Sequence, residues 1–173
     1  MKKILALLTI ILILFISCEG PVGPPGPPGP QGQDGLDGVN LLGQIFEVEV
    51  DFNTGNNFEV FVQFPNQIEV FDTDVVVSYI LVGNENGVDI WEPLPQTLFF
   101  NEGILLYGFN YTFADIVFFL DGTIFLEDLS SDLTQGIIFR TAILPADAAL
   151  DLDLNNMESV MGSFQNQEVI RLN

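Results

Sequence analysis

A glycine at every third position defines the segment from Gly20 to Asn40. Its seven consecutive Gly-X-Y triplets carry six prolines, which preset φ, and the period ends because Gly43 falls out of register. Three wound polyproline II chains need this spacing, since only a hydrogen atom fits at their common axis. The segment therefore has no core of its own and is expected to form an extended stalk of up to roughly 60 Å, as one chain or as three. The glycines of the repeat are Gly20, Gly23, Gly26, Gly29, Gly32, Gly35 and Gly38.

The first seventeen residues are typical of a secretory signal peptide. Lys2 and Lys3 precede the apolar run Ile4–Ile16, which is shorter than the ~20 residues that cross a membrane. The run leads to Phe15-Ile16-Ser17-Cys18, which resembles the lipobox of bacterial lipoproteins and contains the only cysteine of the chain. The resemblance implies cleavage before Cys18 and attachment of diacylglycerol to its thiol. The alternative is an ordinary secretory signal followed by an incidental cysteine.

The repeat itself resembles collagen, and residues 1–40 together resemble the short collagen-like lipoproteins of Gram-negative bacteria. This resemblance implies a membrane anchor at the lipidated Cys18 and a homotrimer formed through the Gly-X-Y repeat. Glu19 stands where lipoproteins retained in the inner membrane usually carry Asp, so the implied location is the outer membrane, on its cell-surface or periplasmic face. The family has an acidic, β-rich C-terminal domain and supplies no catalytic residues.

The composition excludes several classes of protein. The chain has no histidine and one cysteine, so it lacks a Ser-His-Asp site, a zinc site built from His and Cys, and an internal disulfide. Without the signal peptide, two arginines face 24 acids, and this balance argues against nucleic acid as a partner. The glycine run contains no G-x-G and follows no strand, so it is not a dinucleotide-binding motif. The sequence indicates no cofactor.

Residues 44–173, here called the head, follow the signal peptide (1–17) and the segment with the lipidated cysteine and stalk (18–43). Phe46–Phe52 and Phe58–Phe64 alternate apolar and polar residues, as half-buried strands do, and the turn-forming residues between them predict a hairpin. Short strands separated by turns predict an antiparallel β-sandwich, jelly-roll-like, with enough phenylalanines to fill a core. Further strands are expected at Glu69–Phe71, Val75–Val82, Val88–Trp91, Gln96–Phe100, Ile104–Phe113, Ile116–Leu120, Thr123–Leu126 and Gly136–Leu144.

One segment near the C-terminus has helical spacing. Its apolar residues recur at i, i+3, i+4 and i+7, and Asn155 with Glu158 is expected to cap the helix. The spacing predicts a short helix that lies beside the sandwich. The apolar residues are Met157, Val160, Met161 and Phe164.

Few residues of the head are marked for chemistry. Asp151-Leu152-Asp153-Leu154-Asn155 imitates the start of a calcium loop, but Asn156 and Gly162 stand where glycine and glutamate are required, so we interpret it as a turn before the helix. Arg140 lies inside an expected strand and is either one half of a structural ion pair or an anion-binding residue.

Aromatic residues give a second group of candidates. Trp91, Tyr107 and Tyr111 are either packing residues or platforms on which a sugar stacks. Alternation requires Phe61, and one member each of Phe99-Phe100 and Phe118-Phe119, to point away from the inward set, toward a second layer or a trimer interface.

The order of anchor, stalk and domain favours a lipid-anchored cell-envelope protein that displays a β-sandwich for a structural, binding or adhesive role without catalysis. A calcium- or carbohydrate-binding surface module is the alternative. A hydrolase that uses two carboxylates is the third hypothesis, because the acids of the head offer many pairs and the sequence marks none of them.

Overall fold

The computed structural model describes residues 43–164 and 168–172. The predicted lipid-attachment residue Cys18 and the seven repeat glycines from Gly20 to Gly38 lie outside the described residues, as does the predicted signal peptide. Among the helices of the described ranges, none is long and apolar enough to cross a membrane.

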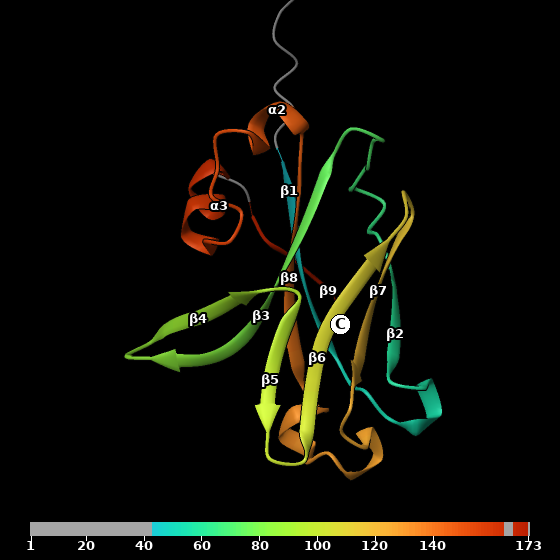
Figure 1. Cartoon of the computed structure of the whole chain (residues 1–173). Coiled ribbons are helices and arrows are strands. Elements are labelled where there is room, and N and C mark those ends of the chain that lie inside the picture. The colour runs from blue at the N-terminus through green and yellow to red at the C-terminus, as the bar shows by residue number, and fades with distance from the viewer. Residues whose placement is uncertain (1–42, 165–167, 173) are drawn as a thin grey trace, which may run out of the picture. The chain divides into compact units, whose positions relative to one another are not determined.

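The head is an all-β sandwich of two sheets, as the alternation predicts (Figure 1). One sheet has five strands in the order β4-β3-β8-β1-β9, and the other has four in the order β2-β7-β6-β5. All pairings are antiparallel except that of β9 with β1. The strands are β1 (Gln44–Val50), β2 (Glu59–Gln63), β3 (Val75–Glu85), β4 (Val88–Pro93), β5 (Gln96–Phe100), β6 (Gly103–Tyr111), β7 (Asp115–Gly122), β8 (Ile137–Leu144) and β9 (Ile170–Leu172).

The main hydrophobic cluster fills the space between the sheets. Phe46, Val48 and Val50 of β1 point into it while the acids between them point outward, as the alternation predicts. Phe118 of β7 and Phe139 of β8 meet across the sandwich with parallel rings whose centroids are 4.2 Å apart. Both rings are fully buried, so this stacked pair joins the two sheets at the centre of the core.

The predicted hairpin of the first two strands is wrong. β1 pairs with β8 and β9 in one sheet, whereas β2 pairs with β7 in the other. The connecting residues form the 3₁₀ turn η1 (Thr54–Asn56), which Asn53 caps by accepting hydrogen bonds from two backbone N–H groups. Asn57 and Phe58 then adopt positive φ, and the chain passes to the opposite layer. The resulting nested pairing, β1 with β8 and β2 with β7, is the jelly-roll-like feature of the fold, and β5, β6 and β7 form a simple meander.

Two of the expected strands are also absent, because local turns take their backbone groups. At Glu69–Phe71, the Phe71 N–H donates to the Asp74 carboxylate and the Phe71 carbonyl accepts from the Asp74 N–H. At Thr123–Leu126, the first two N–H groups both donate to the carbonyl of Ile104, and the chain then enters the 3₁₀ turn η2 (Leu126–Asp128). A third 3₁₀ turn, η3 (Ser131–Leu133), leads into β8.

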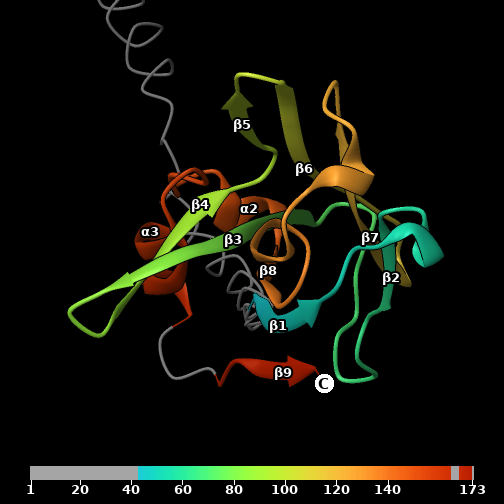
Figure 2. The same ribbon diagram turned by 90° about the horizontal axis from the view of Figure 1, so that it is seen from below.

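Two short helices cover part of the outer face of the five-stranded sheet (Figures 1 and 2). α3 (Met157–Ser163) is the expected helix, and α2 (Ala146–Ala149) was not predicted. The predicted cap is wrong by one residue, since the side chain of Asn156 accepts from two N–H groups of the first turn. A second hydrophobic cluster lies beneath the helices and consists of Ile45, Tyr79, Ala142, Leu144, Ala149, Met157, Val160 and Phe164.

Candidate functional site

The helices leave the remainder of the outer face of the five-stranded sheet open as a groove of about 680 Å³. It lies beside the second hydrophobic cluster, and its lining residues come from strands of that sheet and the segments next to them. The charged residues of the lining are Glu47, Glu49, Asp51, Asp89 and Arg171. Trp91 contributes an aromatic ring, and Val48, Leu81, Ile138 and Leu172 complete the wall.

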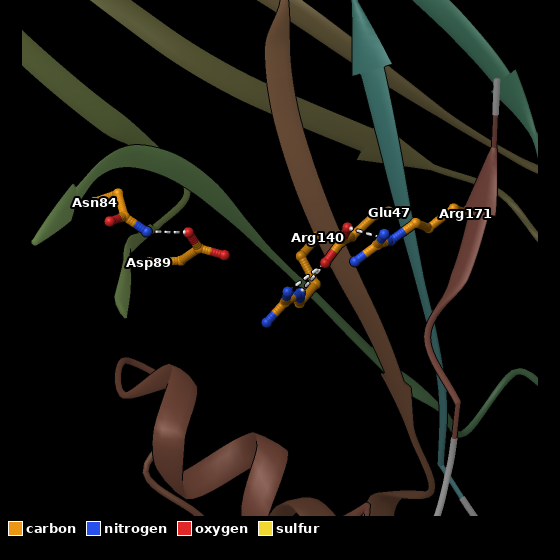
Figure 3. A network of polar contacts seen from close by, with 5 residues as sticks. All are labelled: Glu47, Asn84, Asp89, Arg140 and Arg171. Atoms are coloured by element: carbon orange, nitrogen blue, oxygen red, sulfur yellow. Dashed lines mark hydrogen bonds and ion pairs between the residues drawn. The ribbon is translucent and has the colours of Figure 1, made fainter. Parts of the chain in front are cut away.

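Glu47 is the centre of the charge arrangement (Figure 3). The strand register places it directly opposite Arg140 of β8 on one side and Arg171 of β9 on the other. Arg140 donates from Nε to Glu47 Oε1 at 2.7 Å and also pairs with it through a terminal nitrogen, while Arg171 Nε lies 3.4 Å from Glu47 Oε2. One carboxylate therefore binds both cations of the described residues.

The two ion pairs differ in their surroundings. The side chains of Glu47 and Arg140 are 13% and 15% exposed, whereas that of Arg171 is 78% exposed. The guanidinium of Arg140 also lies over the ring of Trp91, with its Cζ 4.1 Å from the ring centroid. Arg140 is thus held in place by an acid on one side and an aromatic face on the other, which confirms the structural ion pair rather than a free anion-binding residue.

The three aromatic candidates lie in three different environments. Tyr107 is buried in the main core and its hydroxyl donates to the Leu133 carbonyl at 2.7 Å, so of its two alternatives it is a packing residue and not a sugar platform. Tyr111 is 46% exposed, but it stacks on Phe109 and is not part of the groove lining. Trp91 does line the groove, although Arg140 occupies one face of its ring.

Burial perturbs two tyrosines. It raises the pKa of Tyr79 to about 12, with a smaller contribution from the charge of Asp153. It also raises the pKa of Tyr107 to about 12, with a smaller contribution from Asp132. Both hydroxyls are hydrogen-bond donors to backbone carbonyls, and Tyr79 donates to Leu154 at 2.7 Å. These hydroxyls therefore hold the backbone at Leu154 and Leu133 against the sandwich.

The aspartates before α3 form a turn, as interpreted from the sequence. The Asp153 carboxylate accepts from the Asn155 N–H at 3.0 Å, and the Asp153 N–H donates to the hydroxyl of Ser159 at 3.1 Å. Residues 43–164 and 168–172 contain no group of three or more acidic, cysteine or histidine side chains placed to hold a metal ion. At the edge of the sheet, Asn84 donates to Asp89 at 2.9 Å, which fixes that lining carboxylate (Figure 3).

The outward-pointing phenylalanines were predicted in part. Phe61 is 63% exposed, and Phe118 is buried while Phe119 is half-buried, as alternation requires. Phe99 is 78% exposed and points away from the inward set, as predicted for one member of its pair, although Phe100 at the end of this edge strand is also 37% exposed.

Chemically, the groove favours neutral or positively charged ligands, because four carboxylates and one arginine line it. Sequence analysis found Arg140 and Trp91 but missed Glu47, whose role depends on a partner 93 residues away. Comparison of the chain with family models, with curated proteins and with solved structures finds no match.

Proposed function

We propose that this chain is a lipid-anchored, collagen-like protein of the cell envelope that displays an all-β head for a structural, binding or adhesive role. The observation that carries the proposal is the order of segments in the sequence. The only cysteine occupies the lipobox position, seven Gly-X-Y triplets follow it, and β1 begins at Gln44, four residues after the repeat ends. An anchor, a spacer and a domain in this order place the domain away from a membrane surface.

The structure of the head supports a display role. One hydrophobic cluster fills the space between the two sheets and a second lies between the five-stranded sheet and the helices, and residues 43–164 and 168–172 contain no cysteine that could form a disulfide. Its charge adds a second argument, because acids far outnumber the two arginines and repel anionic lipid headgroups. The lipid on Cys18 is therefore the proposed contact with the outer membrane, and the head is held clear of it.

The proposal assigns no catalytic role to the groove. Its central carboxylate, Glu47, is paired with two arginines, and a carboxylate in that arrangement is held as a structural counter-ion. A general acid or base needs a carboxyl group that is available to substrate.

The anchor is tested by separating membrane and soluble fractions of cells that express the full chain. The wild-type protein is expected in the outer-membrane fraction, and the Cys18→Ser variant is expected to lose its acyl chains and leave that fraction. A Ser17→Ala variant is the matched control, since it keeps the thiol and a small residue before the cleavage point. Equal membrane retention of Cys18→Ser and wild type would remove the lipid anchor from the account.

The groove supports a second candidate, a carbohydrate-binding head. An open groove of about 680 Å³ with an aromatic ring and several carboxylates has the elements that bind sugar hydroxyls. Calcium is less favoured there, because the described residues hold no suitable ligand cluster. Glycan-array binding that is lost in Asp89→Asn and in Trp91→Ala, but kept in Phe125→Ser on an exposed loop, would establish this function. An array without any bound glycan would reject it.

A further inference from the structure

The face of the four-stranded sheet that points away from the core carries large apolar side chains among polar ones. Ile116, Phe118 and Leu120 of β7 belong to the main core, so the alternate residues of β7 and their paired neighbours point outward. Six apolar side chains from all four strands share this outer face, and they are here called the outer patch. They are Phe61 of β2, Val117 and Phe119 of β7, Ile104 and Leu106 of β6, and Phe99 of β5.

The outer patch belongs to neither hydrophobic cluster of the head. Phe99 is 78% exposed and Phe61 is 63% exposed, and these two residues lie on the opposite edge strands of the sheet. Between them, the ring of Phe119 lies across Gly108 of the neighbouring strand, so closely that a Cβ on that glycine would come within 2.4 Å of the ring. Because Gly108 has no side chain, the ring of Phe119 lies close to the backbone, and the centre of the patch is therefore flat.

Within residues 43–164 and 168–172, both helices pack on the other sheet and leave this one uncovered (Figures 1 and 2). Apolar patches that bring together several large side chains mark interaction surfaces in soluble domains. The exposure of Phe61 and Phe99 to water is unfavourable, so burying these two side chains against a partner would lower the free energy.

We propose that the outer patch is the surface through which three copies of the head pack together, an inference that rests on the proposed collagen-like protein forming a triple-stranded stalk. Every third residue of the repeat is glycine, and this spacing is required only when three chains wind together. Three wound stalks would bring three heads to a common axis, because only the three residues 41–43 separate the repeat from β1. The tether raises the effective concentration of each head for the others, so a modest apolar contact suffices.

The charges around the patch favour this occupant over a lipid surface. Glu59, Asp115 and Asp121 share the outer face, while the two described arginines are both bound at Glu47 on the other sheet. An anionic membrane would be repelled by these acids. Two further copies carry the same acids, but the stalk would bring them to the patch in spite of the like charge.

A threefold arrangement also explains why both flanks are apolar. In a closed ring the contact is heterologous, so one flank of each copy meets the opposite flank of the next copy. The patch spans four strands, a width of about 14 Å between the outermost strands, with one exposed phenylalanine at each side. Phe61 of one copy is therefore expected to lie near Phe99 of the next.

The test compares the unlipidated mature chain, residues 19–173, with a Phe61→Ser/Phe99→Ser variant by sedimentation equilibrium. Both residues are exposed in the single head, so the variant is expected to fold with an unchanged circular dichroism spectrum. The wild-type chain is expected to form a trimer, and the double substitution is expected to weaken its association about tenfold or more, the effect of losing central apolar contacts. Phe125→Ser is the matched control, because Phe125 is 80% exposed and lies off the patch.

The outcomes separate the inference from the proposed function. A wild-type trimer that the double substitution weakens, with the control unchanged, supports the patch as the interface. A trimer that all three proteins form equally well overturns the inference and leaves the stalk as the sole trimerising element. A wild-type monomer at high micromolar concentration overturns the inference and the trimer, but not the anchor at Cys18. The inference would also be overturned if the unlipidated wild-type chain floated with phosphatidylethanolamine–phosphatidylglycerol vesicles and the double variant did not. Lipid would then be the occupant of the outer patch.

Discussion

Replacing Glu47 by glutamine tests whether the cross-strand ion pairs stabilise the head. The substitution keeps the size of the side chain but removes the charge that holds Arg140, whose side chain is only 15% exposed. Removing one partner of a fully buried ion pair lowers the free energy of unfolding by roughly 3–5 kcal/mol. Glu47 and Arg140 are both partly exposed, so the expected loss here is about 2–3 kcal/mol. The Arg171 pair adds little, because its side chain is 78% exposed.

The assay is unfolding of the variant in urea and on heating. For a domain of this size, the expected loss corresponds to a decrease in Tm of about 6–15 °C. Glu49→Gln is the matched control, since Glu49 is on the same strand and the same face, lies opposite the uncharged Ile138, and is expected to change stability by less than about 0.5 kcal/mol. Equal losses in the two variants, or no loss in Glu47→Gln, would refute the assigned role of the pair. Combining Glu47→Gln with Arg140→Met should recover part of the loss, because no buried charge is then left unpaired.

Gly122→Ala should cost more than about 2 kcal/mol in urea unfolding, because its φ is +156° and a Cβ there would be 2.0 Å from a backbone oxygen of the neighbouring strand. The control Gly83→Ala should be near neutral, since open space surrounds that position, and equal costs would contradict the reasoning. Asn156→Ala should lose about 1 kcal/mol by removing the cap of α3, and an unchanged Tm would argue against the cap. Tyr79 and Tyr107 release their protons near pH 10.0 in the unfolded chain, whereas the fold raises both pKa values to about 12. Their contribution to the free energy of unfolding should therefore be fully present below pH 10 and should be lost as the pH rises toward 12. Phenolate absorbance that shows all tyrosines ionised at pH 10 in the folded protein would contradict this.

The strands were predictable where alternation is long and uninterrupted. β1 and β2 appear close to where their patterns place them, since period-two burial is a local property of the sequence. The partner of each strand was not predictable in the same way. Asn53 and Asn57 signal a turn, but whether a turn joins strands of one sheet or carries the chain to another depends on which distant strand has already paired with β1. β9 was missed because its three residues are too few to show a period.

The candidate site was less predictable than the fold. Arg140 was singled out because cations are so rare in this chain. The identity of that acid could not be predicted, because many acids alternate along strands and only the β1–β8 register selects Glu47. The groove exists because α2 and α3 stop short of one end of the sheet, which depends on packing between distant segments.

The most direct test of the proposed architecture is the mass of the N-terminal peptide of the mature protein, purified from membranes of cells that express the full chain. The account predicts a peptide that begins at Cys18 and carries a thioether-linked diacylglycerol, with all residues before it removed. A peptide that contains Cys18 as a free thiol would contradict the account, because nothing would then hold the stalk and the head at the membrane.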